Sequence, residues 1–274
     1  MIKGVSKKID GINRTWLCVI DSFSDEFKEL IRARLASICH GCSRANNKGK
    51  TNNDVYSYKN TLRTFMNRYK GKGQITKKGM IGELLAHLLI SHCDKNMKTA
   101  SPFLNMEESS IKKGFDLVLL NNKSRDLWFT EVKAGHGGKK ISNTKNKLLL
   151  ELAKKDIKQR LDSNKDSLWL NAINGVTIAF EKNTKFKKLV LEILKESYSD
   201  SQNDKVSSLS KNVVLVSVLY KSLKDRLDFK EIQIIREKII REKSFCGIVV
   251  FSIQKETYTK IENFLTAETN NGQD

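Results

Sequence analysis

Residues 114–133 have the pattern of a β-hairpin whose two strands carry charged residues at matching positions. The first apolar strand opens at Asp116, and the second closes on Glu131-Val132-Lys133. The polar residues between the strands are typical of a turn. If the hairpin is symmetric about Lys123-Ser124, Asp116 lies directly across from Glu131.

The two acids and a lysine are expected to share one face of this hairpin. Opposite residues of an antiparallel pair share a face, and a period of two adds Lys133 to it. The remaining residues of that face are apolar: Val118, Leu120, Leu127 and Phe129. Burying two acids together is costly unless a cation joins them. A divalent metal ion and Lys133 would compensate the two acids, so this face is predicted to hold an active site.

The predicted site has the residue types that metal-assisted phosphodiester hydrolysis needs. Asp116 and Glu131 are expected to hold Mg²⁺, with Mn²⁺ as an alternative, because such hard cations prefer oxygen ligands. The main-chain carbonyl of Val132 is a candidate third ligand. Lys133 cannot bind the metal; it would orient or help deprotonate the attacking water and offset charge on the phosphate.

A fourth acid, Glu83, lies on a helix expected over residues 77–92. It follows Gly82 at the edge of the apolar stripe, and we interpret it as a ligand or neighbour of the metal. The alternative is a solvated glutamate on an amphipathic helix. His87, one turn later, is interpreted as a packed or surface histidine.

The charge of the chain indicates a polyanionic partner. The 274 residues include 50 Lys and Arg against 31 Asp and Glu, a net charge of +19. DNA is the first expectation, and an anionic membrane surface is the alternative. No apolar run is long enough to span a bilayer. Amides of Gly137 and Gly138 and a set of basic residues are candidate contacts to the DNA backbone rather than to bases. The basic set is His136, Lys139, Lys140, Lys154, Lys155 and Lys158.

Cysteine usage favours a reducing, cytoplasmic environment. The five cysteines are an odd number scattered through the chain, and the N-terminus lacks the apolar core of a signal peptide. Cys39-His40-Gly41-Cys42 admits a zinc site, but no second ligand pair of that kind follows. The alternative is a helix end stopped by Gly41.

The order of expected elements indicates an α/β protein. Residues 1–75 are interpreted as a basic, mainly helical region with helices near 27–38 and 60–69, and 76–274 as an α/β domain with its catalytic core at 77–180. The core is expected to contain a helix at 77–92, a strand at 101–106, the hairpin at 115–133, a helix at 144–162 and a strand at 175–180. A helix at 184–197, a loop at 199–211, a strand at 213–219, a helix at 229–241, a strand at 245–252 and a terminal helix follow.

Glu83 on a helix, Asp116 opening a strand and Glu131-Val132-Lys133 closing the next resemble the PD-(D/E)XK nuclease superfamily. That resemblance implies an α-β-β-β-α-β core, a mixed central sheet flanked by helices, and metal-dependent deoxyribonuclease activity. The chain departs from the superfamily name in one respect, because Gly114-Phe115 stands where the eponymous proline would be.

Three segments also resemble a narrower family, HamA, the nuclease subunit of the Hachiman anti-phage system. They are Gly79-x-x-Gly-Glu83, Gly-Phe-Asp116 and Glu131-Val-Lys133, and the resemblance covers residues 60–180. It implies a helicase partner, HamB, and a nuclease restrained until DNA damage or invasion is sensed. Here Thr130 precedes Glu131, where HamA-like proteins often have glycine.

Two other functions remain open from the sequence. A stand-alone restriction-type enzyme would act as a dimer and read a base sequence, but no dedicated recognition element is evident. A non-catalytic nucleic-acid-binding subunit on a decayed nuclease fold is the other. Decay normally deletes a metal ligand or the lysine, whereas Asp116, Glu131 and Lys133 are all present.

Overall fold

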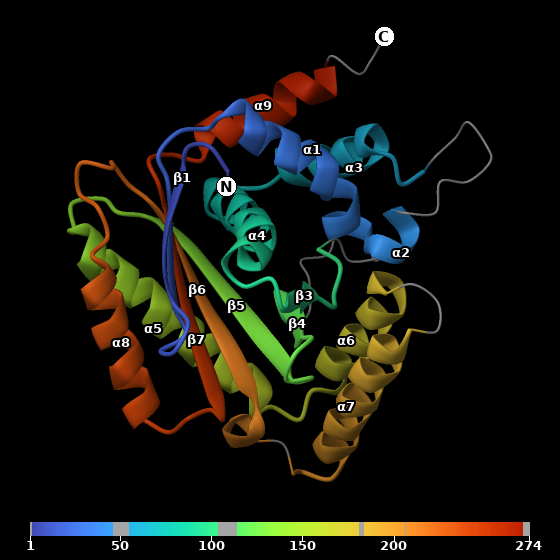
Figure 1. Ribbon diagram of the computed structural model, residues 1–274. Coiled ribbons are helices and arrows are strands. Elements are labelled where there is room, and N and C mark those ends of the chain that lie inside the picture. Colours follow the sequence, from blue (N-terminus) through green and yellow to red (C-terminus); the bar gives the residue numbers. More distant parts are fainter. Residues whose placement is uncertain (1, 46–54, 104–113, 181–183, 206, 271–274) are drawn as a thin grey trace.

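A computed structural model describes residues 2–45, 55–103, 114–180, 184–205 and 207–270. Its strands are β1 (Val5–Asp10), β2 (Thr15–Ile20), β3 (Met97–Thr99), β4 (Leu117–Asn121), β5 (Leu127–His136), β6 (Asn212–Tyr220) and β7 (Gly247–Lys255). In the described part of the chain they form one seven-stranded sheet with the order β1-β2-β7-β6-β5-β4-β3 (Figure 1). The four strands from β2 to β5 in this order are parallel, and the other pairs are antiparallel.

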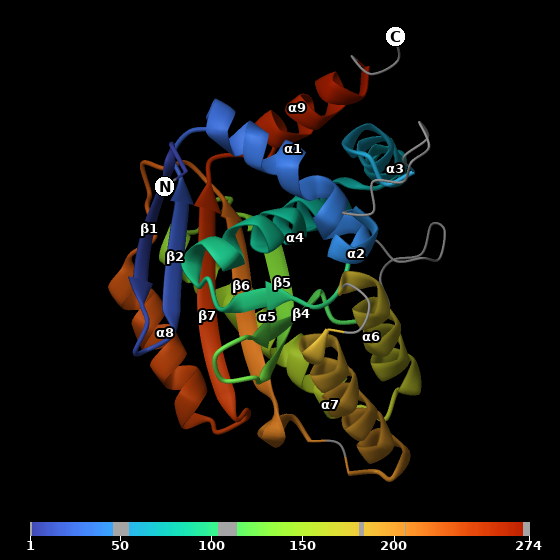
Figure 2. The same cartoon turned by 45° about the vertical axis from the view of Figure 1, so that its right-hand side comes forward.

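Different helices cover the two faces of the sheet (Figures 1 and 2). One face packs against α1 (Asp25–His40), α3 (Tyr58–Lys70), α4 (Gln74–Cys93) and α9 (Thr259–Asn270). The other packs against α5 (Ser142–Leu161), α6 (Asp166–Ala179), α7 (Lys185–Gln202) and α8 (Phe229–Arg241). The short α2 (Cys42–Ala45) follows α1. The helices that the structure describes include none that is long and apolar enough to cross a membrane.

The central strands follow directly from their sequences. β6 and β7 are nearly continuous apolar runs, and almost every residue in them is buried. Such runs are typical of parallel strands covered on both faces. The strands expected at 213–219 and 245–252 are therefore confirmed as β6 and β7. The helices expected at 144–162 and 229–241 are confirmed as α5 and α8. The α/β class and a mixed sheet flanked by helices are confirmed with them.

The first twenty residues form two strands that the sequence analysis did not predict, at the start of the region expected to be mainly helical. β1 and β2 form an antiparallel hairpin, and β2 pairs in parallel with β7, so this segment belongs to the central sheet. All six residues of β2 are buried. Their apolar run, Trp-Leu-Cys-Val-Ile, is itself typical of a buried strand. The helices expected near 27–38 and 60–69 are confirmed as α1 and α3.

The strand expected at 175–180 is wrong, because residues 175–179 form the end of α6 and Phe180 caps it. The buried residues of α6 recur at helical spacing from Leu168 through Ala172 and Val176 to Ala179. The last six residues alone are β-branched and apolar, which made them look like a strand. The next helix, α7, also continues to Gln202, into the loop expected from 199.

The strand expected at 101–106 is also misplaced. The observed strand is β3 at 97–99; residues 101–103 are not in a strand, and 104–106 lie outside the described residues. The chain leaves the sheet at Pro102, which has no N–H to donate. Ser101 Oγ instead accepts from Val118 N at 2.9 Å, and Phe103 N donates to Ile38 O at 2.7 Å.

Gly82 lets α4 approach β5 closely. A Cβ at this position would lie 2.6 Å from the Cβ of Ala134. We expect Gly82→Ala to lower the free energy of unfolding by about 1–3 kcal/mol, despite alanine's better helix propensity. Gly79→Ala is the matched control on the same helix, because nothing lies within 4 Å of its added Cβ. It should raise stability by about 0.5–1 kcal/mol.

Urea unfolding of the two single variants checks this packing. Combining Gly82→Ala with Ala134→Gly should recover part of the loss, because the second change restores the space. A Gly82→Ala protein as stable as Gly79→Ala would contradict the close approach of α4 to β5.

Candidate active site

The hairpin has the register that its symmetry predicts. In the β4–β5 ladder Leu117 pairs with Thr130 and Val118 with Phe129. One step further, the same register sets Asp116 opposite Glu131. The turn is fixed by Asn121 Oδ1, which accepts hydrogen bonds from the backbone N–H groups of Lys123 at 2.9 Å and Ser124 at 3.2 Å.

Asp116 is held where β5 runs on past β4. The backbone N–H of Val132 donates to Asp116 Oδ2 at 2.7 Å. Because the N–H and C=O of one extended residue point to the same side of a strand, the Val132 carbonyl faces this same side. The Asp116 side chain is 14% exposed, so the carboxylate lies at the rim of the core rather than within it.

Glu131 is buried between two cationic side chains. Its own side chain is only 1% exposed. Lys133 Nζ lies 2.7 Å from Glu131 Oε1, and Arg160 Nη1 lies 2.7 Å from Glu131 Oε2. Arg160 Nη1 also lies 3.7 Å from Asp116 Oδ1 and donates to Gly114 O at 2.8 Å. The guanidinium therefore bridges both carboxylates and the chain just before β4.

Two residues of this cluster were not found by sequence reasoning. Asp156 Oδ2 lies 2.7 Å from Lys133 Nζ, and Arg160 is the second cation on Glu131. Both lie on α5, one helical turn apart, so they share a face. The usable signal was the connection: α5 is the first helix of the crossover between the parallel strands β5 and β6, and such a helix packs on one face of the strands. The pair at i and i+4 was thus available to meet Glu131 and Lys133.

The surroundings of Glu131 raise its pKa to about 7. Burial is the largest cause, the nearby charge of Asp116 is the second, and Arg160 and Lys133 oppose both. For Lys133, burial alone would lower the pKa, but the charges of Glu131 and Asp156 outweigh it and raise the pKa. Lys133 therefore holds its proton in this arrangement.

The raised pKa of Glu131 predicts a pH dependence of stability without metal. Folding favours the protonated acid, whose usual pKa is 4.5. The free energy of unfolding should therefore fall as pH rises from 4.5 to about 7, by up to roughly 3 kcal/mol. Urea unfolding in EDTA across this range measures it. Glu131→Gln should remove this component, and an identical pH profile in that variant would contradict the assignment.

A comparison with protein families identifies the kind of protein that carries this cluster. The model of the HamA family matches residues 3–269, nearly the whole chain. The chain belongs to the HamA family. HamA is a component of the Hachiman anti-phage defence system. No curated protein shows significant similarity to the sequence.

In this HamA-family chain, Glu83 lies on the helix that covers the opposite face of β5. Its helix, α4, packs on the face of Val132 and Ala134, whereas Glu131 and Lys133 face α5. Glu83 is half-buried. His87 is 2% exposed and packs edge-on against Phe103, with ring centroids 5.6 Å apart, as expected for a packed histidine.

The candidate DNA contacts fall into an exposed and a paired group. His136, Lys139, Lys140 and Lys155 are exposed. Lys154 is paired at 2.8 Å with Glu242, which caps the end of α8, and Lys158 is paired with Asp162. The backbone amides of Gly137 and Gly138, expected to contact the DNA backbone, instead form hydrogen bonds within the protein. Gly137 N donates to Tyr220 O at 3.1 Å, and Gly138 N donates to His136 Nδ1 at 3.1 Å. The first bond exists because pairing of β5 with β6 continues to their ends.

The cluster fits a hard divalent cation. Asp116, Glu131 and the Val132 carbonyl are oxygen donors, and Glu131 is buried beside a second acid, an arrangement that a bound cation would stabilise. Among the residues that the structure describes, no three His, Cys, Asp or Glu side chains are grouped to hold a metal. This includes the Cys39-to-Cys42 segment, in which Cys39 is buried and Cys42 exposed at a helix end.

Proposed function

We propose that this HamA-family chain is a Mg²⁺-dependent DNA nuclease and the effector subunit of a Hachiman complex. The observation that carries the proposal is the juxtaposition of Asp116, Glu131 and Lys133 at the end of the β4–β5 hairpin. Two acids can hold the metal ion that assists phosphodiester hydrolysis, and a nearby lysine can position the water and offset charge on the phosphate. The resemblance to the PD-(D/E)XK superfamily adds support through the element order α4, β3, β4, β5, α5 and, after two inserted helices, β6.

Each residue has a role that follows from its contacts. Asp116, Glu131 and the Val132 carbonyl would hold Mg²⁺, and Glu83 on α4 would be a further acid near the ion. When bound, the ion would polarise the phosphate and lower the pKa of a bound water. Lys133 carries its proton, so it would orient the attacking water and offset charge on the phosphate. Asp156 keeps Lys133 pointed at the cluster.

The DNA backbone would approach the part of β5 that extends beyond β4. This end of β5 leads to the exposed basic residues His136, Lys139 and Lys140. Contacts of this kind are made to phosphates and do not distinguish one base sequence from another. A net charge of +19 would add non-specific attraction for DNA along the whole chain.

A nuclease that binds any DNA strongly must be restrained in its host. We propose that a HamB-like helicase is the partner that restrains it until DNA damage or invasion is sensed. The support is membership of the HamA family together with the absence of sequence-specific readout in the proposed contacts.

Cleavage of plasmid and linear DNA by the purified protein tests the proposal. Mg²⁺ or Mn²⁺ should support cutting that EDTA abolishes, either by the chain alone or once its helicase partner and damaged DNA are added. No metal-dependent cutting under any of these conditions would favour the non-catalytic binding subunit. A dimer that cuts at one fixed base sequence would favour the restriction-type enzyme.

A further inference from the structure

Two cysteine side chains meet on the face of the sheet that α4 covers, opposite to the face of the carboxylate cluster. Cys18 lies in β2 and Cys93 is the last residue of α4, and their Sγ atoms are 3.5 Å apart. The two residues are 75 positions apart in the sequence, so the fold brings them together. The sulfurs of a disulfide are about 2.0 Å apart, and rotation of one cysteine about χ1 can move its sulfur far enough to close the gap.

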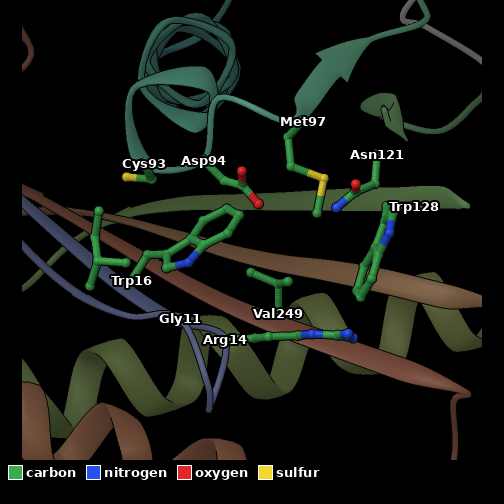
Figure 3. Close-up of a pocket in the computed structure, with 10 residues that line it drawn as sticks. Gly11, Arg14, Trp16, Cys93, Asp94, Met97, Asn121, Trp128 and Val249 are labelled. Atoms are coloured by element: carbon green, nitrogen blue, oxygen red, sulfur yellow. The ribbon is translucent and has the colours of Figure 1, made fainter. Parts of the chain in front are cut away.

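A small oxidant can reach one of the two sulfurs. Cys18 is 0% exposed, whereas Cys93 is partly exposed. Cys93 also lines a cavity of about 300 Å³ between the β1–β2 turn, the end of α4 and the turn end of the β4–β5 hairpin. In Figure 3 its side chain lies next to Asp94, at the opposite end of this cavity from Trp128. A cavity of that volume admits several molecules of the size of water, and hydrogen peroxide is little larger than water.

The other three cysteines lack this arrangement. All five cysteines lie in the described part of the chain, and Cys18 with Cys93 is the pair whose sulfurs are in contact. Cys39 is fully buried, and burial raises the pKa of its thiol, so it is inert. Cys42 and Cys246 are exposed at separate places. An oxidised sulfur at Cys93 therefore has one thiol within reach inside the molecule, that of Cys18.

The link would join the N-terminal hairpin to the helix that packs behind β5. At the end of α4, Lys7 Nζ of β1 already donates to His92 O at 2.9 Å, but this contact is exposed. Nearer its start, α4 approaches β5 closely at Gly82. The loop that a Cys18–Cys93 bond would close contains α1 and α3. The bond would therefore restrain the helical layer on this face of the sheet.

We propose that Cys18 and Cys93 are an oxidation site at which a peroxide forms a reversible disulfide. The Cys93 sulfur attacks one peroxide oxygen, the O–O bond breaks, and a sulfenic acid and one water result. The Cys18 sulfur then attacks the sulfenic sulfur, so that the S–S bond forms and the hydroxyl leaves with the Cys18 proton as a second water. Two thiols lose two electrons and one peroxide gains them. The site is independent of the proposed nuclease activity, and a dithiol reverses it by exchange.

Thiol counting and mass spectrometry of the full chain after treatment with hydrogen peroxide test the site. The starting protein carries Cys42→Ser and Cys246→Ser, because these two exposed thiols would otherwise pair between molecules. After oxidation, only the Cys39 thiol should remain to be alkylated in denaturant. Digestion without reductant should yield one linked peptide pair that holds Cys18 and Cys93 and has lost two hydrogen atoms. Dithiothreitol should restore both thiols.

The oxidised protein should unfold about 5–15 °C above the reduced protein, because the bond closes a long loop. Adding Cys93→Ser to the same background is the matched control. It removes the partly exposed thiol and should abolish both the linked peptide and the shift in unfolding temperature. Two outcomes would overturn the proposal: Cys93 oxidised to a sulfinic acid with no linked peptide, or both thiols still free at a peroxide dose that oxidises Cys246 in the wild type.

Discussion

Lys133→Met is expected to lower the rate of metal-dependent DNA cleavage about 10³-fold while leaving DNA affinity nearly unchanged. Methionine keeps most of the length of the side chain but removes the charge that lies 2.7 Å from both Glu131 and Asp156. The lost interaction is with the water and phosphate that react, not with the bulk of the bound DNA. Initial rates of plasmid nicking at saturating DNA, with affinity measured separately in EDTA, check it.

Lys123→Met is the matched control, because Lys123 is an exposed lysine in the turn of the same hairpin. It should cut at the wild-type rate, while Asp116→Asn should be as inactive as Lys133→Met. Wild-type cutting by Lys133→Met would remove this residue from the mechanism. A parallel loss of DNA binding would instead make it a binding residue.

Arg160→Ala is expected to lower the free energy of unfolding in EDTA by about 2 kcal/mol. Removing the guanidinium leaves the buried Glu131 next to Asp116 with only Lys133 as a cation. The loss is smaller than for a fully buried pair, because the Arg160 side chain is 35% exposed. A divalent ion should then stabilise the variant more than the wild type, since the ion supplies the missing charge. Urea unfolding with EDTA or Mn²⁺ measures both effects.

Arg241→Ala is a suitable control, because Arg241 is 82% exposed and its nearest ion pair is 4.0 Å long. Its stability should not depend on metal. If Arg160→Ala lost the same stability with and without Mn²⁺, the arginine would be a structural contact only, and the link between its charge and the metal would fail.

The hairpin could be predicted in detail because all its determinants are local. The turn centre and a period of two fix which residues are opposite and which face they share. Asp116, Glu131 and Lys133 therefore meet as predicted from the sequence alone. The central strands were equally clear, since their apolar runs leave no exposed face.

The missed parts depend on contacts between distant segments. Asp156 and Arg160 reach the cluster only because α5, the first helix after β5, packs over that face of the sheet. A helical pattern alone does not give the direction of the helix. The end of α6 looked like a strand because six β-branched and apolar residues were read without the helical spacing before them. β2 was missed although its apolar run resembles those of β6 and β7, and its partner β7 lies more than 200 residues further along the chain.

The location of Mn²⁺ by anomalous scattering from crystals of the wild-type protein is the most direct test of the central claim. We expect an ion bound by Asp116, Glu131 and the Val132 carbonyl, beside Lys133 and with Arg160 moved away from the carboxylates. The same crystals of Asp116→Asn should show no such peak. An ion bound elsewhere in a protein that cuts DNA, or full Mn²⁺ occupancy in Asp116→Asn, would contradict the assignment of this cluster as the metal site.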